Sequence, residues 1–269
     1  DDTPDMESKL ALIDTLRKVT DGKIYVEVER ARLTYKLVKM REAEKNIEEA
    51  AKLLLDLQVE TFGSMDRKEK VELLLEQMRL SLARKDFTRA QSSSRKISTK
   101  FFADKDTIVQ AMKIRFYHMM IQVDLHESSY LAVSRHYSAL VETPKVSADK
   151  DKKEESVKCS LLFALLAPHA PDQVTELHRL KDQRAMERLP DHKHLAELLT
   201  TQEMVDWAQL DKTASKVLRA KGSVFAQGEK DGDARWDVLH TRVAQHNIRV
   251  IAKYYDRITL ERMGELLSW

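Results

Sequence analysis

Apolar residues recur every three or four positions along most of this chain, the spacing of amphipathic helices. The pattern is clearest near the end, where the apolar stripe comprises Trp236, Leu239, Val243, Ala244, Ile248, Val250, Ile251, Tyr254 and Tyr255. Shorter segments with the same period predict helices over residues 5–19, 24–40, 42–60, 66–84, 87–98, 106–125, 129–141, 153–167 and 202–218. Residues 146–153 are expected to form a polar loop, and Pro190 interrupts shorter helices within residues 172–200.

The helical pattern near the end of the chain breaks at Asp256-Arg257 and restarts at once. Thr259 is suited to cap a second helix, because its hydroxyl can accept a hydrogen bond from a first-turn N–H group. Ile258 and Met263 flank this cap with the spacing of a hydrophobic staple. A long helix, a tight turn and a short capped helix are typical of the start of a helix-turn-helix or winged-helix unit.

A short motif recurs in the first half of the chain. A polar residue, an apolar residue and, three positions later, a small residue occur at 46–50 (NIEEA), 86–90 (DFTRA) and 129–133 (SYLAV). A spacing of about 40 residues is typical of solenoids built from helical hairpins. The predicted organisation is a helical-repeat solenoid over residues 1–220, an exposed glycine-containing loop over 221–234, and a linker helix with the start of a second helix over 235–269.

The composition supports an all-α fold and narrows the function. The 269 residues include only six glycines and five prolines, which leaves little room for strands and turns. Lys and Arg number 46 against 44 Asp and Glu, a balance that argues against a dedicated nucleic-acid-binding protein. The single cysteine, Cys159, fits a reducing compartment, so the cytoplasm and nucleus are expected. The longest apolar run, residues 161–167, is too short to span a bilayer, and no membrane association is expected.

No motif in the sequence indicates a catalytic site. The pair His192 and His194 resembles the start of a metalloprotease motif, but Gln202 and Val205 occupy the positions where that motif needs Ser and Asp. Two solvated histidines near a helix start are the expected explanation. Cys159 lies in an apolar helical segment and is expected to be a buried core residue rather than a nucleophile. No catalytic residue, metal, cofactor or small-molecule substrate is predicted.

The helix-turn-helix-like end has two interpretations. A DNA-reading helix needs unopposed cations for phosphates, but acidic residues alternate here with Lys253, Arg257 and Arg262. Binding to another protein is therefore favoured, with Arg257 and Arg262 at the turn and the terminal Trp269 as candidate partner-binding residues.

Longer stretches carry a resemblance to a known family. The run HNIRVIAKYYDRITLERMGELL, from His246, resembles the start of the PCI module shared by scaffold subunits of the proteasome lid, the signalosome and a translation initiation factor complex. Further stretches are similar to one family of lid subunits: GKIYVEVERARLTYKL from Gly22, LQVETFGSMDRKEKVELLLEQMRL from Leu57, ISTKFF from Ile97 and RWDVLHTRVAQHNIRVIAKYY from Arg235.

This resemblance implies a right-handed superhelical solenoid of TPR/HEAT-like helix pairs that ends in a long linker helix and an incomplete winged helix. It implies a non-catalytic scaffold of the proteasome regulatory-particle lid that supports ubiquitin-dependent degradation. The implied partners are other lid subunits, including the deubiquitinase, and the ATPase base. A complete PCI module continues beyond its second helix, so the chain is expected to be a fragment. A signalosome scaffold and a nucleic-acid-binding winged-helix protein are the alternatives.

Overall fold

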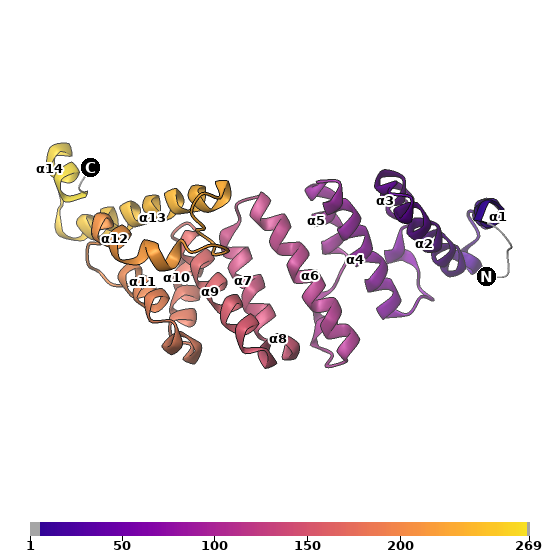
Figure 1. Cartoon of the computed structure of the whole chain (residues 1–269), viewed down its shortest axis with the longest axis horizontal. Helices are drawn as coiled ribbons and strands as arrows, with labels where there is room; N and C mark the ends of the chain where they lie inside the picture. Colours follow the sequence, from indigo (N-terminus) through magenta and orange to yellow (C-terminus); the bar gives the residue numbers. More distant parts are fainter. Residues whose placement is uncertain (1–5, 268–269) are drawn as a thin grey trace. The chain divides into compact units, whose positions relative to one another are not determined.

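The computed structural model describes residues 6–267, and every regular element among them is helical (Figure 1). The chain divides into two compact units, residues 1–126 and 127–269. The described helices of the first unit are α1 (Met6–Val19), η1 (Ile24–Val26), α2 (Glu27–Ala43), α3 (Ile47–Leu55), η2 (Val59–Thr61), α4 (Arg67–Ala83), α5 (Phe87–Arg95), η3 (Thr99–Ala103) and α6 (Thr107–His126). Those of the second are α7 (Tyr130–Val141), α8 (Pro144–Ala148), α9 (Lys150–Leu166), α10 (Pro171–Lys181), η4 (Arg184–Arg188), α11 (Pro190–Thr200), α12 (Trp207–Leu218), α13 (Lys230–Tyr254) and α14 (Leu260–Leu267).

A left-handed residue forms the turn between paired helices in the first unit. Lys45, between α2 and α3, has a φ of 62°. The next amide, that of Asn46, donates to the carbonyl of Arg41 at 2.9 Å, which is the six-to-one bond of a Schellman motif. The Asn46 side chain then accepts from the Glu49 amide and caps α3. Lys85-Asp86 repeats the arrangement between α4 and α5, so the chain reverses within a few residues.

The motif predicted from the sequence is confirmed as a structural repeat. Its polar residue is the N-cap position of α3, α5 and α7, and a residue with positive φ precedes it each time. The small residue of each copy, Ala50, Ala90 or Val133, is fully buried. A small side chain there permits close approach of a neighbouring helix.

The helix prediction over residues 42–60 is wrong in its extent. The left-handed Lys45 ends α2 and α3 begins only at Ile47, so the predicted segment contains one helix end, a turn and a nine-residue helix. The predicted loop over 146–153 is also wrong. Pro144 starts α8, and the Asp149 side chain accepts from the Lys152 amide to start α9 at Lys150. Favourable capping by Asp149 therefore decides against a loop in this polar segment.

A buried carboxylate joins three helices of the first unit. Glu76 of α4 has a side chain that is 5% exposed. One of its oxygens accepts two hydrogen bonds from Arg79, at 2.9 and 2.7 Å, and the other accepts one from Arg115 of α6 at 2.5 Å. The ammonium of Lys39, on α2, lies 3.5 Å away. Burial opposes ionisation of Glu76, but the hydrogen bond from Arg79 and the three positive charges outweigh it and lower its pKa.

Helix α9 forms the centre of the second unit. The residues of its last turns are buried around the whole circumference, and α7, α10, α11 and α13 pack against it. Phe163 stacks on Tyr137 of α7 with 5.8 Å between ring centroids. The apolar run at 161–167 is therefore the core of a helical unit. No helix in the described part of the chain is both long and apolar enough to cross a membrane.

The segment before α13 forms no helix, but the prediction of an exposed loop over residues 221–234 is wrong in its middle, where Val224, Phe225 and Ala226 are buried. Phe225 is fully buried and lies edge-on to Trp236, with 5.4 Å between ring centroids. Trp236 also contacts Trp207 of α12. Helix α13 begins at Lys230, and a Cβ atom on Gly232 in its first turn would lie 2.1 Å from the Ala226 carbonyl oxygen. A segment of low hydropathy therefore contains a buried aromatic side chain that packs on α13.

Candidate partner-binding surfaces

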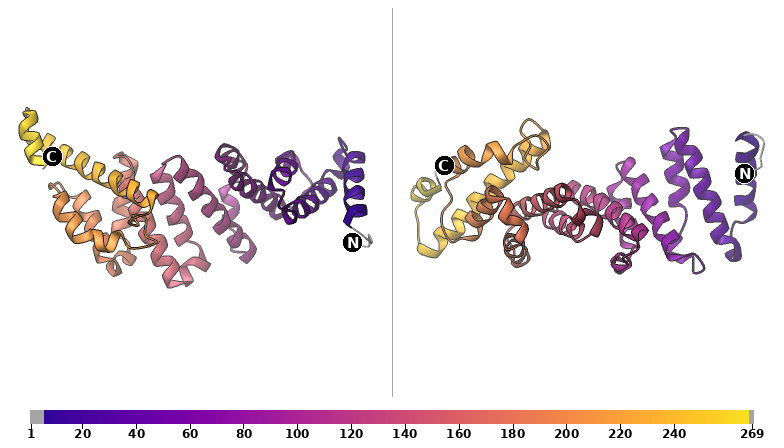
Figure 2. Two further views of the ribbon diagram at one scale, coloured as in Figure 1. Left: turned by 45° about the horizontal axis from the view of Figure 1, so that its top comes forward. Right: turned by 60° about the horizontal axis from the view of Figure 1, so that its bottom comes forward.

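The end of α13 and helix α14 form the first candidate surface. Figure 2 shows α14 following the C-terminal end of α13 after a bend. Thr259 caps α14 as predicted, because its hydroxyl accepts from the Arg262 amide at 3.2 Å. Leu260 is 83% exposed and Tyr254 72% exposed. The bend therefore presents apolar side chains to solvent, which is typical of a protein-binding surface when they cluster.

The apolar stripe predicted for the long helix is confirmed at the positions that are buried, which extend to Ile251. Trp236, Leu239, Val243 and Val250 are buried, but Tyr254 is exposed. Ile248 and Tyr255, which were expected to widen the stripe, are also exposed. The unit thus buries the stripe as far as Ile251, whereas Ile248, Tyr254 and Tyr255 are at least 41% exposed.

The predicted partner-binding residues are placed as follows. Arg257 is exposed in the turn between α13 and α14. Arg262 lies in the first turn of α14 and donates to Glu265 at 2.7 Å, and this bond together with Tyr255 raises its pKa. Trp269 lies outside the described residues. Partner binding by all three stays a prediction.

Polar side chains of α13 hold this helix to the rest of the second unit. The buried Asn247 accepts from the Val205 amide and donates to the Val205 carbonyl, both at 2.8 Å. His246 hydrogen-bonds the Glu203 carbonyl at 2.9 Å, and Arg242 donates to the Leu166 carbonyl at 2.8 Å. These contacts fix the segment after α11 and the end of α9 against α13.

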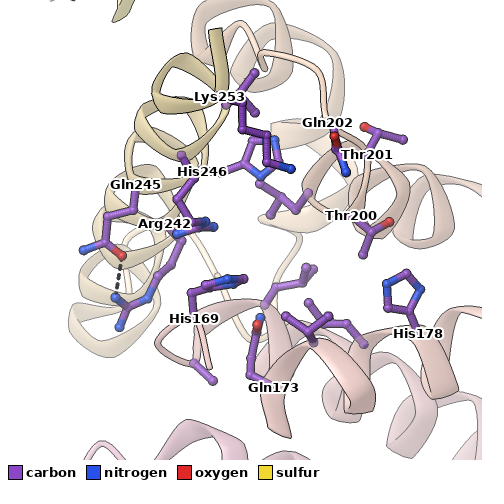
Figure 3. Close-up of a pocket in the computed structure, with 17 residues that line it drawn as sticks. His169, Gln173, His178, Thr200, Thr201, Gln202, Arg242, Gln245, His246 and Lys253 are labelled. Carbon is purple, nitrogen blue, oxygen red and sulfur yellow. Dashed lines mark hydrogen bonds between the residues drawn. The ribbon is translucent and has the colours of Figure 1, made fainter. Parts of the chain in front are cut away.

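A second candidate surface is a cavity of about 310 Å³ between α13 and segments of α9, α10 and α11 (Figure 3). Its basic lining residues are His169, His178, Arg242, His246, Arg249 and Lys253. Figure 3 shows His169, Gln173 and His178 across the cavity from α13. No aspartate or glutamate is among its lining residues, all of which are described. The cavity is thus suited to anionic groups.

The sequence analysis did not find this cavity, although the sequence contains a signal for it. Arg242, His246, Arg249 and Lys253 follow one another at intervals of four, three and four residues. That spacing places them on one face of a helix. The same helix also carries the apolar stripe, whose stronger periodicity masks the basic face in the sequence.

The cysteine and the two paired histidines that the sequence offers as reactive groups differ in their burial. Cys159 is buried as expected, and burial, together with the charge of Glu155, raises its pKa to about 12. His192 is buried rather than solvated, which corrects the prediction, and burial lowers its pKa, whereas His194 is exposed. Among the described residues, no cluster of His, Cys, Asp and Glu could hold a metal ion.

Paired helices with short capped turns, stacked around continuous cores, define a helical-repeat protein of the α-solenoid class. Residues 1–149 match the family model described as PSMD12/CSN4, N-terminal, and the chain belongs to this family.

Among its relatives, the 26S proteasome regulatory subunit rpn501 of Schizosaccharomyces pombe is 41% identical over 264 residues, covering 98% of this chain and 59% of that protein. The 26S proteasome regulatory subunit RPN5 of Saccharomyces cerevisiae is 36% identical, covering 98% of this chain and 58% of that protein. The COP9 signalosome complex subunit 4 of Dictyostelium discoideum is 22% identical over 267 residues. The chain thus spans about three fifths of the length of the curated relatives it matches.

Proposed function

We propose that this chain is part of a non-catalytic scaffold subunit of the proteasome regulatory-particle lid, acting in ubiquitin-dependent degradation through protein–protein contacts. The observation that carries the proposal is the identity of 36–41% with proteasome regulatory subunits over 98% or more of the chain. Identity with the signalosome subunit is far lower, at 22%.

The proposed partners are other lid subunits, including the deubiquitinase, and the ATPase base. Stacked hairpins suit such a role, because each contacts mainly its neighbours and leaves a long surface for other proteins. The exposed bend with Arg257, Arg262 and Leu260 is the proposed contact at the end of the chain. The proposed location is the cytoplasm and nucleus, where proteasome subunits would be available as partners.

Affinity purification of the tagged parent protein from its own cells tests this function. Proteasome lid and base subunits are expected to co-purify in stoichiometric amounts. Co-purification with signalosome subunits instead, or with neither complex, would contradict the proposal. Peptidase activity against ubiquitin chains in the isolated protein would contradict the non-catalytic assignment.

A variant pair tests the contact at the bend. Arg257→Glu is expected to reduce recovery of lid subunits, whereas Lys212→Glu, on the exposed face of α12, should leave recovery unchanged. Equal recovery with both variants would remove Arg257 from the interface. Fluorescence microscopy of the tagged protein tests the cytoplasmic and nuclear location.

A further inference from the structure

The cavity beneath α13 concentrates positive charge without an internal counter-ion. Its 17 lining residues include two arginines and one lysine but no carboxylate. Burial lowers the pKa of two of its histidines, His169 and His246, so these two are neutral near pH 7 and the charge comes from the arginines and the lysine. Arg242 donates only to neutral groups there, the Leu166 carbonyl at 2.8 Å and the Gln245 side-chain oxygen at 2.9 Å. Among the described residues, no carboxylate pairs with Arg249 or Lys253. The positive charge of the cavity is therefore not neutralised by the part of the chain that the structure describes.

Half-buried arginines elsewhere in this chain are paired with carboxylates, which the arginines of the cavity lack. Arg79 and Arg115 each contact two carboxylates at 2.7 Å or less, and their pKa values are raised. In the cavity, by contrast, burial lowers the pKa of both Arg242 and Arg249, and the charge of Arg242 lowers that of Arg249 further. An anion bound here would raise the pKa of both arginines again, because an opposite charge stabilises the protonated guanidinium.

A buried amide adds a second requirement. Gln173 is 6% exposed, and its nitrogen donates to the Ala164 carbonyl at 3.1 Å. Its side-chain oxygen has no hydrogen-bond partner although it is fully buried. Figure 3 shows the Gln173 side chain directed into the cavity from α10. A buried acceptor without a donor is unfavourable, so a ligand that supplied an N–H or O–H group to it would remove this cost.

We propose that this cavity binds an acidic peptide segment of a partner protein. The peptide's carboxylates would pair with Arg249 and Lys253 at the mouth and with Arg242, and a backbone N–H would donate to the Gln173 oxygen. An acidic peptide supplies both the negative charge and the donor, whereas a fully ionised phosphate supplies only the charge. The assignment rests on the proposed function in one respect, that the chain acts by binding proteins, and it names the chemistry of one bound segment.

The test uses fluorescence anisotropy of the whole chain with a labelled hexaglutamate peptide, capped at both ends. Hexaglutamine and an N-methylated hexaglutamate serve as comparison peptides. Arg249→Gln/Lys253→Gln is the test variant, because no hydrogen bond within the described chain depends on either side chain. Lys212→Gln/Lys216→Gln on α12 is the matched control, since it removes the same charge from an exposed face of the same unit. Circular dichroism checks that both variants remain folded.

The wild-type chain is expected to bind hexaglutamate and not hexaglutamine. The test variant should lose roughly tenfold or more in affinity and the control less than about twofold, because only the first pair lines the cavity. N-methylation should also weaken binding. Equal losses in both variants would indicate a diffuse surface charge and overturn the assignment. Displacement by inorganic phosphate with no effect of N-methylation would also overturn it, in favour of a phosphate site.

Peptide binding and co-purification are separate measurements. A protein that joins the proteasome but does not bind hexaglutamate refutes the cavity assignment alone. A protein that binds hexaglutamate but does not associate with the proteasome refutes the proposed function and leaves the cavity assignment standing.

Discussion

Replacing Glu76 by glutamine should destabilise the first unit, because its carboxylate is the shared acceptor of three helices. The substitution keeps the volume of the side chain and one oxygen but removes the negative charge. Three charge-assisted hydrogen bonds, two from Arg79 and one from Arg115, are then weakened or lost. The new amide nitrogen also faces cations that cannot accept a hydrogen bond from it.

The size of the effect follows from these contacts. A hydrogen bond to a charged group contributes about 1.5–3 kcal/mol, and a neutral one about 0.5–1.5 kcal/mol. Arg79 and Arg115 are 39% exposed and each retains a second carboxylate, Glu42 or Glu72, so the loss is less than for an isolated buried pair. A neutral glutamine costs less free energy to bury than the Glu76 carboxylate, and this difference offsets part of the lost stability. We therefore expect a decrease of about 2–3 kcal/mol in the free energy of unfolding of the first unit.

Urea denaturation followed by circular dichroism measures the change, and hydrogen exchange of α2, α4 and α6 shows where it acts. Glu72→Gln is the control, because Glu72 is 31% exposed and pairs, among the described residues, with Arg115 alone. It should decrease the free energy of unfolding by less than about 1 kcal/mol. The three tryptophans all lie in the second unit, so their fluorescence reports that unit separately. Equal effects of the two substitutions, or a gain in stability for Glu76→Gln, would refute the reasoning.

The lowered pKa of Glu76 adds a pH dependence. Because its pKa is lower in the folded state than its ordinary value of 4.5, its stabilising contribution is present above about pH 4.5. The contribution is lost as the pH falls through the folded-state pKa. The difference in stability between wild type and Glu76→Gln should therefore shrink as acid is added below that pH. A difference that is constant down to the lowest pH at which the protein folds would contradict this.

Three further predictions concern the second unit. Gly232→Ala should lower the free energy of unfolding by about 3 kcal/mol, because the added methyl meets backbone atoms of Ala226, whereas Gly63→Ala, in open space, should have little effect in thermal melts. Asn247→Ala should destabilise by about 2–4 kcal/mol, since both backbone groups of buried Val205 lose their partner, and loss of protection of the Val205 amide in hydrogen exchange would verify it. Cys159 should resist a thiol-specific reagent in the native protein and react on unfolding, because its pKa of about 12 leaves little thiolate near neutral pH; rapid native labelling would exclude this.

The sequence predicted the helices best where a local signal marked both ends. The fourth helix was predicted over residues 66–84 and observed at Arg67–Ala83, with Asp66 accepting from two first-turn amides. The polar and small residues of the repeated motif coincide with the N-cap and a buried position of α3, α5 and α7, because N-caps and small buried residues are local requirements of a tight hairpin. The left-handed turn at Lys45 was missed, since nothing in a lysine side chain identifies positive φ.

Tertiary contacts explain the remaining errors. Residues 221–229 have the glycines and charges of a surface loop, yet Phe225 and Ala226 are buried because Trp236 and Gly232 of α13 pack on them. In the same way, the buried Glu76 resembles any other charged residue of a solvated helix face until its three cations, from three helices, are brought together. Neither environment can be predicted from the spacing of residues within one helix, because each is formed by residues from different segments of the chain.

Helix α13 has an apolar face and a basic face, and the same helical spacing marks both in the sequence. Its apolar face was predicted from Trp236, Leu239 and Val243, and burial confirms these positions. Its basic face repeats with the same helical spacing but lacks the interleaved carboxylates of α4, where Glu69, Glu72 and Glu76 meet cations from other helices. A solvated helix face normally mixes charges of both signs. A basic stripe without acidic neighbours on a helix whose other face is buried therefore indicates a binding function for the exposed part, and in this protein it leads to the cavity lined by Arg242 and Arg249.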